Sequence, residues 1–219
     1  MATEETRERL LDTAERHFSE QGFAGASLRA ITRDARANLA AVSYHFGSKE
    51  DLFVAVVARR LDPINRERLR LFDEAEARAG GRALEVETIL EVMILPVLRA
   101  GSDGPCVLRM FGRANADADV PTRRIVEGPM REVRARVHQA LRRALPKLSE
   151  RELAYRMHFT LGAVKSVASD QHLLRAMSDG RCDPSDLEGT ARHLIPFLAA
   201  GMQAKAPRIA VKSTRKVRS

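Results

Sequence analysis

The sequence contains little of what marks several common classes of protein. Among its 219 residues there is no tryptophan, and the only cysteines are Cys106 and Cys182. Two cysteines this far apart have neither the close spacing of a zinc site nor the pattern of a disulfide framework. We therefore expect two inert thiols in a reducing cytoplasm, with a redox-sensing pair as the alternative.

Long apolar runs are also missing. The most apolar stretch, residues 89–98, is interrupted by Glu91 and has about half the length of a membrane span. The N-terminus is charged and has no apolar segment of the kind found in signal peptides. These features predict a soluble, cytoplasmic protein with no membrane partner.

The usual patterns of catalytic and metal-binding residues are absent as well. Ser43 and His45 lie two residues apart on an expected helix, so their side chains point in different directions and form no nucleophile–base pair. The six histidines include no pair spaced by three or four residues, and no glycine-rich phosphate loop is present. The sequence predicts no catalytic residue, no metal site and no cofactor, and therefore a protein that is not an enzyme.

The abundant residues favour helices. Alanine, leucine and arginine are frequent, aromatic residues make up only 5% of the chain, and the hydrophobic content of 44% is that of a globular protein. The fold class predicted is all-α. Of the net charge of +8, residues 205–219 carry +6, because they contain six basic and no acidic residues. We expect this segment to be a flexible basic tail.

The stretch from Ser27 to Asp51 predicts two short helices and the start of a third. Ser27 and Asn38 are suitable N-caps, and Ser48 with Asp51 forms a capping box. Small and hydrogen-bonding side chains cover the outer face of the second helix, so its backbone can closely approach a partner. The outward residues are Ala40, Ala41, Ser43, Tyr44 and His45.

Local charge favours nucleic acid as that partner. Residues 27–49 contain four basic residues and one acidic residue, whereas residues 1–60 contain nine of each. A short helix held by a turn fits the DNA major groove, which is about 12 Å wide. An ordinary helical hairpin within a bundle is the alternative interpretation.

The N-terminal residues resemble a known family. The resemblance rests on the run from Leu10 to Phe18, on Gly22-Phe23, Ser27-Leu28-Arg29 and Ile31, and on the run from Val42 to Lys49. Together they are similar to the DNA-binding domain of TetR-family (tetracycline-repressor-like) transcriptional regulators. Residues 38–42, 155–163 and 195–202 further resemble a subgroup with members that respond to fatty acids or acyl compounds.

The chain departs from this family at three positions. Arg36 stands where the turn usually has glycine, Ala37 follows where valine is common, and Ser43 replaces a more frequent aromatic residue. If Arg36 has a positive φ, the strain costs about 1 kcal/mol. These differences affect the expected operator sequence more than DNA binding itself.

The resemblance implies a helix-turn-helix DNA-binding domain at residues 1–50 and a ligand-binding and dimerisation domain at 51–204. The basic tail at 205–219, expected from its charge, follows them. Ser27, Tyr44 and Lys49 are assigned to phosphates by their expected positions, and the other outward residues to base edges. The complete predicted DNA-binding set is Ser27, Leu28, Arg29, Asn38, Leu39, Ala40, Ala41, Ser43, Tyr44, His45 and Lys49.

The second domain predicts a ligand pocket. The helix expected at residues 84–100 is apolar on nearly every side, and a kink at Pro96 would leave space beside it. Simple core packing is the alternative for its apolar side chains. Arg109, a cation flanked by apolar residues, would suit a fatty-acid carboxylate or an acyl phosphate, and a salt bridge to Glu87 or Glu91 is the alternative. The predicted ligand-binding residues are Met93, Val97, Arg109, Met110, Phe111, Val133, His158 and Phe159.

The last two long helices are amphipathic and predict a homodimer through a four-helix bundle, the interface that the resemblance also implies. Two recognition helices about 34–36 Å apart would fit a palindromic operator. The function predicted is a ligand-responsive DNA-binding regulator, most simply a repressor, with a small apolar or acyl effector. The predicted interface residues are Leu161, Ala168, Leu187, Ala191, Leu194 and Leu198.

Two other functions remain open from the sequence. One is a helical protein–protein interaction module without sequence-specific DNA binding. The other is nonspecific coating of DNA through the basic tail, which would survive changes in the recognition helix and be lost when residues 205–219 are removed.

Overall fold

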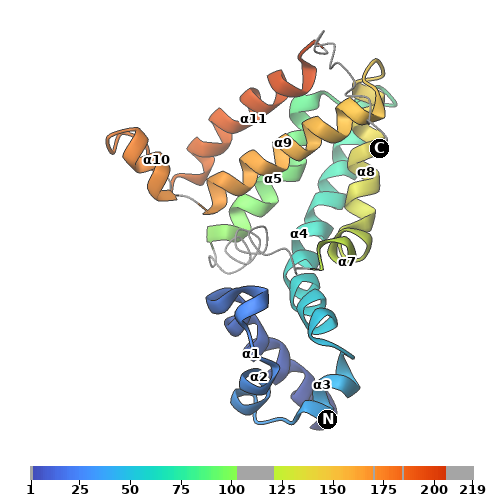
Figure 1. Ribbon diagram of the computed structural model, residues 1–219. Coiled ribbons are helices and arrows are strands. Elements are labelled where there is room, and N and C mark those ends of the chain that lie inside the picture. Colours follow the sequence, from blue (N-terminus) through green and yellow to red (C-terminus); the bar gives the residue numbers. More distant parts are fainter. Residues whose placement is uncertain (1, 103–120, 170, 184, 206–219) are drawn as a thin grey trace, which may run out of the picture.

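A computed structural model describes residues 2–102, 121–169, 171–183 and 185–205, and these contain helices and no strands. Figure 1 shows a small N-terminal group of helices joined to a larger group by one long helix. The all-α fold class is therefore confirmed. The helices are α1 (Ala2–Gly25), α2 (Leu28–Asp34), α3 (Leu39–His45), α4 (Lys49–Ala79), α5 (Val86–Ser102), α7 (Thr122–Glu127), α8 (Arg131–Ala144), α9 (Glu150–Ser169), α10 (Gln171–Met177) and α11 (Leu187–Gln203).

The N-terminal group has its own apolar core, to which α1, α2, α3 and the first part of α4 contribute. Phe53 of α4 packs edge-on against Phe18 and Phe23, with ring centroids 4.9 and 5.1 Å apart. Glu15 of α1 is 6% exposed and accepts hydrogen bonds from Arg59 and Arg60 of α4, each at 2.7 Å. The buried carboxylate is thus neutralised, and it joins the two longer helices of this group.

Helix α4 passes from the N-terminal group into the larger one. It has 31 residues and is about 46 Å long at 1.5 Å per residue. Proline usually ends or bends a helix, but α4 continues past Pro63. It ends at Gly80, which has the left-handed φ of 57° and ψ of 42° of a C-terminal cap.

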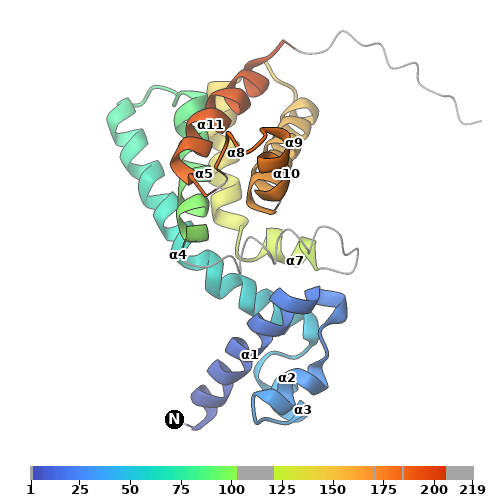
Figure 2. The same cartoon turned by 90° about the vertical axis from the view of Figure 1, so that its left-hand side faces the viewer.

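Helix α5 lies in the middle of the larger group and packs against α4, α8 and α11; Figure 2 shows it between α4 and α11. Helix α9 packs against both α11 and α5. Ile89, Leu90 and Ile94 of α5 are almost fully buried, in agreement with its apolar sequence. Within the described ranges, no helix is both long and apolar enough to cross a bilayer.

The helical spacing of apolar residues over 120–145 predicts one long helix, and this prediction is wrong, because the chain breaks at Gly128-Pro129 into α7 and α8. Proline disfavours helical backbone at the residue before it, and Gly128 has φ −96° and ψ −106°. The break turns Ile125 away from the larger core and into the N-terminal one, where it is 5% exposed.

The sequence predicts that the last two long helices begin at Ser149, in a capping box with Glu152, and at Asp183, and these two predictions have different outcomes. Ser149 and Glu152 form the predicted capping box, with each backbone N–H donating to the other side chain. Helix α11 begins later than expected. Asp186 caps it by accepting from Gly189 N–H at 2.7 Å, whereas Asp183 accepts from Ser185 in the preceding turn.

Candidate nucleic-acid interface

Helices α2 and α3 lie in the N-terminal group, at the end of the molecule remote from α9 and α11 (Figure 1). Asn38 caps α3, since its side chain accepts from Ala41 N–H at 2.8 Å. Ser48 caps α4 by accepting from Asp51 N–H at 3.0 Å. Ser27 occupies the N-cap position of α2 but makes no cap hydrogen bond, so its hydroxyl is not occupied by that role.

Most predicted DNA-binding side chains face solvent. Tyr44 is 78% exposed and Leu39 is 46% exposed, so both side chains are accessible to a partner. The exposed members of the predicted set are Ser27, Arg29, Asn38, Leu39, Ala40, Ser43 and Tyr44, and the half-buried members are Leu28, Ala41, His45 and Lys49. The structure therefore leaves the outer face of α3 open, with the basic residues of α2 and α4 on either side.

Lys49 has a more specific environment than the sequence indicated. Its ammonium group lies 4.7 Å from the centre of the Phe23 ring and 3.4 Å from the Ala24 carbonyl oxygen. These contacts hold the charge beside the start of α2 rather than extending it into solvent. A phosphate bound there would meet a cation whose position is already restricted.

A buried histidine fixes α2 against α1. His17 is 6% exposed, and its Nε2 lies 2.9 Å from the Asp34 carboxylate, while Gln21 contacts its other ring nitrogen at 3.1 Å. The hydrogen bonds from His17 and then Arg33 hold the pKa of Asp34 below its ordinary value. The single acidic residue within residues 27–49 is therefore engaged internally and does not oppose a phosphate directly.

The turn between α2 and α3 contains the unusual arginine. Arg36 has a φ of 52°, and its N–H donates to Arg33 while the next N–H, of Ala37, donates to Thr32. This is the C-terminal pattern in which helices usually place glycine, because a side chain is strained there. The condition stated for strain at Arg36, a positive φ, is therefore met.

Arg36→Gly should therefore stabilise the protein by about 1 kcal/mol, because it removes the left-handed strain. Thermal and urea unfolding followed by circular dichroism would measure the change. Arg33→Gly, which removes the same charge from the interior of α2, is the matched control and should cost about 1 kcal/mol. A loss of stability in Arg36→Gly would contradict the strain.

A contact between the two groups was missed by the sequence reasoning. Arg124 of α7 donates to the Asp51 carboxylate at 2.6 Å, and the other oxygen of Asp51 accepts from Ser48 at 2.6 Å. The turn that positions Lys49 is thus held from the larger domain as well. No local pattern in the sequence links residues 73 positions apart.

The family models match both parts of the chain. Residues 10–56 match the model described as bacterial regulatory proteins of the tetR family, and residues 91–201 match the tetracyclin repressor-like C-terminal domain. The second match alone spans 111 of the 219 residues. The chain belongs to the TetR family.

Curated TetR-type relatives align over shorter stretches. The chain is 35% identical over 66 residues to the HTH-type transcriptional repressor NicS of Pseudomonas putida, which is 30% of this chain and 31% of the relative. It is 37% identical over 76 residues to the HTH-type nicotine-responsive transcriptional repressor HdnoR of Paenarthrobacter nicotinovorans, covering 35% and 39%. The chain thus spans well under half the length of these two relatives.

The fold of the whole chain has counterparts among solved structures. The fatty acid degradation regulator FadR from Bacillus halodurans superposes with a TM-score of 0.55 at 14% identity, covering 89% of this chain and 98% of that chain. A TetR-like transcriptional regulator from Rhodococcus sp. RHA1 superposes with a TM-score of 0.51 at 22% identity, covering 91% and 97%. These similarities support a TetR-type fold in both domains.

The residues predicted to bind a ligand are not gathered in one place. Met93 and Val133 lie in the core of the larger domain and Val97 is half-buried. Their apolar packing agrees with the alternative interpretation. His158 and Phe159 are exposed on α9, Phe159 by 64%, so their placement in an internal pocket is wrong. Arg109, Met110 and Phe111 lie outside the described residues.

The predicted interface residues mostly pack within the protomer. Ala191 and Leu198 are 3% and 6% exposed in the core, and Leu187 and Leu194 pack against the same core. The apolar stripe of α11 is therefore turned inward, which leaves little of Ala191 and Leu198 for a partner. Leu161 is 44% exposed, and the side chain of Ala168 lies outside the described set.

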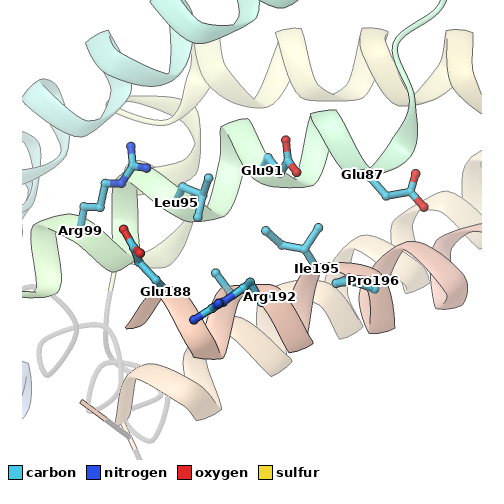
Figure 3. A pocket seen from close by; sticks show the side chains of 9 residues that line it. Glu87, Glu91, Leu95, Arg99, Glu188, Arg192, Ile195 and Pro196 are labelled. Carbon is cyan, nitrogen blue, oxygen red and sulfur yellow. The ribbon is translucent and has the colours of Figure 1, made fainter. Parts of the chain in front are cut away.

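A surface groove of about 450 Å³ lies between α5 and α11 (Figure 3). Leu95, Ile195 and Pro196 contribute apolar surface, and charged side chains from both helices surround them. Glu87, one of its lining residues, accepts a hydrogen bond from the Gln203 amide at 3.2 Å. The groove is thus a mixed, charged surface, unlike the apolar cavity predicted beside Pro96. It is lined by Glu87, Glu91, Leu95, Arg99, Glu188, Ala191, Arg192, Ile195 and Pro196.

Proposed function

We propose that this TetR-family chain is a transcriptional repressor that binds operator DNA in the cytoplasm through α2, α3 and the start of α4. The observation that carries this proposal is the open outer face of α3, where Tyr44 is 78% exposed. An exposed aromatic side chain beside small residues and basic flanks suits contact with the DNA backbone and base edges. A gel-shift with DNA from upstream of its own gene would separate this function from that of a protein–protein interaction module.

Lys49→Ala should weaken binding to any duplex and reduce the salt dependence of binding. Each phosphate contact contributes about −0.9 to the slope of log K against log salt, so a dimer losing two contacts should change by about 2. Fluorescence anisotropy with operator and random duplexes, at several salt concentrations, would measure both effects. Lys147→Ala, at an exposed lysine of the larger domain, is the matched control. An unchanged slope in Lys49→Ala would remove the phosphate assignment.

We further propose that the repressor is a homodimer, with the outer faces of α9 and α11 as its interface. Tyr155, Phe159 and Phe197 are 53%, 64% and 72% exposed on these helices. Gly162 and Gly201 are exposed among them and would allow close approach of a second backbone. Large apolar side chains in this number indicate a protein partner, and a second copy forms a self-complementary four-helix bundle.

The proposed effector is a small apolar or acyl molecule that binds in the larger domain. It would lower DNA affinity if it bound more tightly to a dimer whose recognition helices no longer match a palindromic operator. The Arg124–Asp51 contact and the continuous α4 both reach the DNA-binding group. They supply two routes by which a shift in the larger domain would move Lys49.

A further inference from the structure

Arg68 is a buried cation in the larger part of α4. It is 7% exposed, and arginine is seldom buried this fully without a carboxylate partner. Burial lowers the pKa of Arg68 to about 10, so the guanidinium remains charged at neutral pH. Among the described residues no carboxylate lies within ion-pair distance of Arg68. Its charged N–H groups therefore donate only to neutral oxygen acceptors.

Those acceptors are backbone and amide oxygens. The Nε and Nη2 groups of Arg68 donate to the Met93 carbonyl at 3.0 and 2.8 Å, and Nη1 donates to the Asn65 side chain at 3.1 Å. Pro96 lacks the N–H that would bond to the Val92 carbonyl, so the helical hydrogen bonds of α5 are interrupted one residue before Met93. Arg68 thus binds the backbone of α5 directly beside this interruption.

These bonds use three of the five N–H groups of the guanidinium. The other two, one on each terminal nitrogen, have no acceptor among the described residues. A carboxylate accepts two parallel N–H bonds from such a fork and would neutralise the buried charge. Phe72, one turn further along α4, and Met93 are both buried in the core of the larger group, so the surroundings of the guanidinium are apolar.

We infer that Arg68 binds the acidic head group of the effector, and that the effector class is an apolar carboxylic acid. This inference rests on the proposed function, because it names the chemistry of the ligand to which the repressor responds. The acid would accept from the two remaining N–H groups and, by pulling on the same guanidinium, would weaken its bonds to the Met93 carbonyl and the Asn65 side-chain oxygen. Arg68 was not among the predicted ligand-binding residues, since an arginine on a charged helix such as α4 has no distinctive sequence pattern.

Asn65 connects this site to the DNA-binding group. It is 7% exposed, and its amide donates to the Pro129 carbonyl at 2.9 Å, in the turn between α7 and α8. The preceding α7 carries Ile125 into the N-terminal core and Arg124 to the Asp51 carboxylate. An acid that draws Arg68 away from Asn65 would loosen the hold on α7, and through α7 the turn that positions Lys49.

Calorimetric titration of the full-length protein with dodecanoate and with dodecanol tests the inference. The wild type should bind the acid about tenfold to a hundredfold more tightly than the alcohol, the range that charge-assisted hydrogen bonds supply. Arg68→Met, which keeps the length and apolar stem, should abolish this preference without changing the affinity for dodecanol. Arg66→Met, at an exposed arginine of the same helix, is the matched control and should retain the preference.

Arg68→Lys keeps the charge but loses the fork, so a reduced preference for the acid is expected, which tests the site even if Arg68→Met does not fold. Equal affinity for the two probes, binding of neither, or a preference that survives Arg68→Met overturns the inference. Operator binding by the unliganded wild type is measured separately by anisotropy. Its absence would remove the proposed function, while an acid preference that depends on Arg68 would still stand.

Discussion

Phe197→Glu should convert the dimer into a monomer and weaken operator binding by more than about a hundredfold. In a twofold interface the substitution occurs twice, so two carboxylates approach each other where two aromatic rings were buried. Loss of both rings alone removes about 2 kcal/mol of burial per side chain. Phe197 is 72% exposed in the protomer, so the fold of each chain should be unaffected.

Sedimentation equilibrium over a range of protein concentrations would measure the dimer constant, and anisotropy the DNA affinity. Phe197→Leu keeps an apolar side chain at the same place and should remain dimeric. If Phe197→Glu stayed dimeric, the interface would lie on another face of the larger domain. A monomer that retained full operator affinity would instead contradict the need for two recognition helices.

Ala40→Glu should abolish detectable operator binding while leaving the fold and the dimer intact. The residue is exposed in the first turn of α3, so the new carboxylate would face the phosphates, and like charges in close contact cost several kcal/mol. The same charge is favourable for the helix, because an acidic residue in the first turn interacts well with the helix dipole. DNA affinity and helix stability should therefore change in opposite directions.

Gel-shift titration and thermal unfolding would measure the two effects of Ala40→Glu separately. Ala135→Glu, at an exposed alanine of α8, adds the same charge in the larger domain and should retain operator binding. Unchanged DNA affinity in Ala40→Glu would show that the outer face of α3 does not enter the groove.

The N-terminal domain could be predicted well from its sequence because its information is local. Caps act over three residues, so Asn38 and Ser48 specify the starts of α3 and α4 by themselves. The strain at Arg36 was stated only as a condition, and it came from the glycine that the resembled family usually has at this turn position. The contact between Arg124 and Asp51 joins distant residues, and no spacing rule reports such a pair.

The larger domain was predicted less well, since periodicity identifies an apolar stripe but not what covers it. The stripe of α11 that contains Ala191 and Leu198 was assigned to a second copy, yet it packs in the protomer's own core. Phe197 stands outside that stripe and was overlooked. Gly128-Pro129 is a sequence pattern that breaks helices. The apolar residues on either side of it nevertheless keep helical spacing, and this spacing led to the prediction of one continuous helix.

The two separate apolar cores have a consequence for how the molecule behaves before it meets its operator. They are bridged by α4, and Met130 packs against both. Small cores are only marginally stable, so the N-terminal one can open locally while the larger one stays closed. A duplex that binds only the closed form would then tighten it by mass action. The N-terminal domain would then be most ordered when it is bound to DNA.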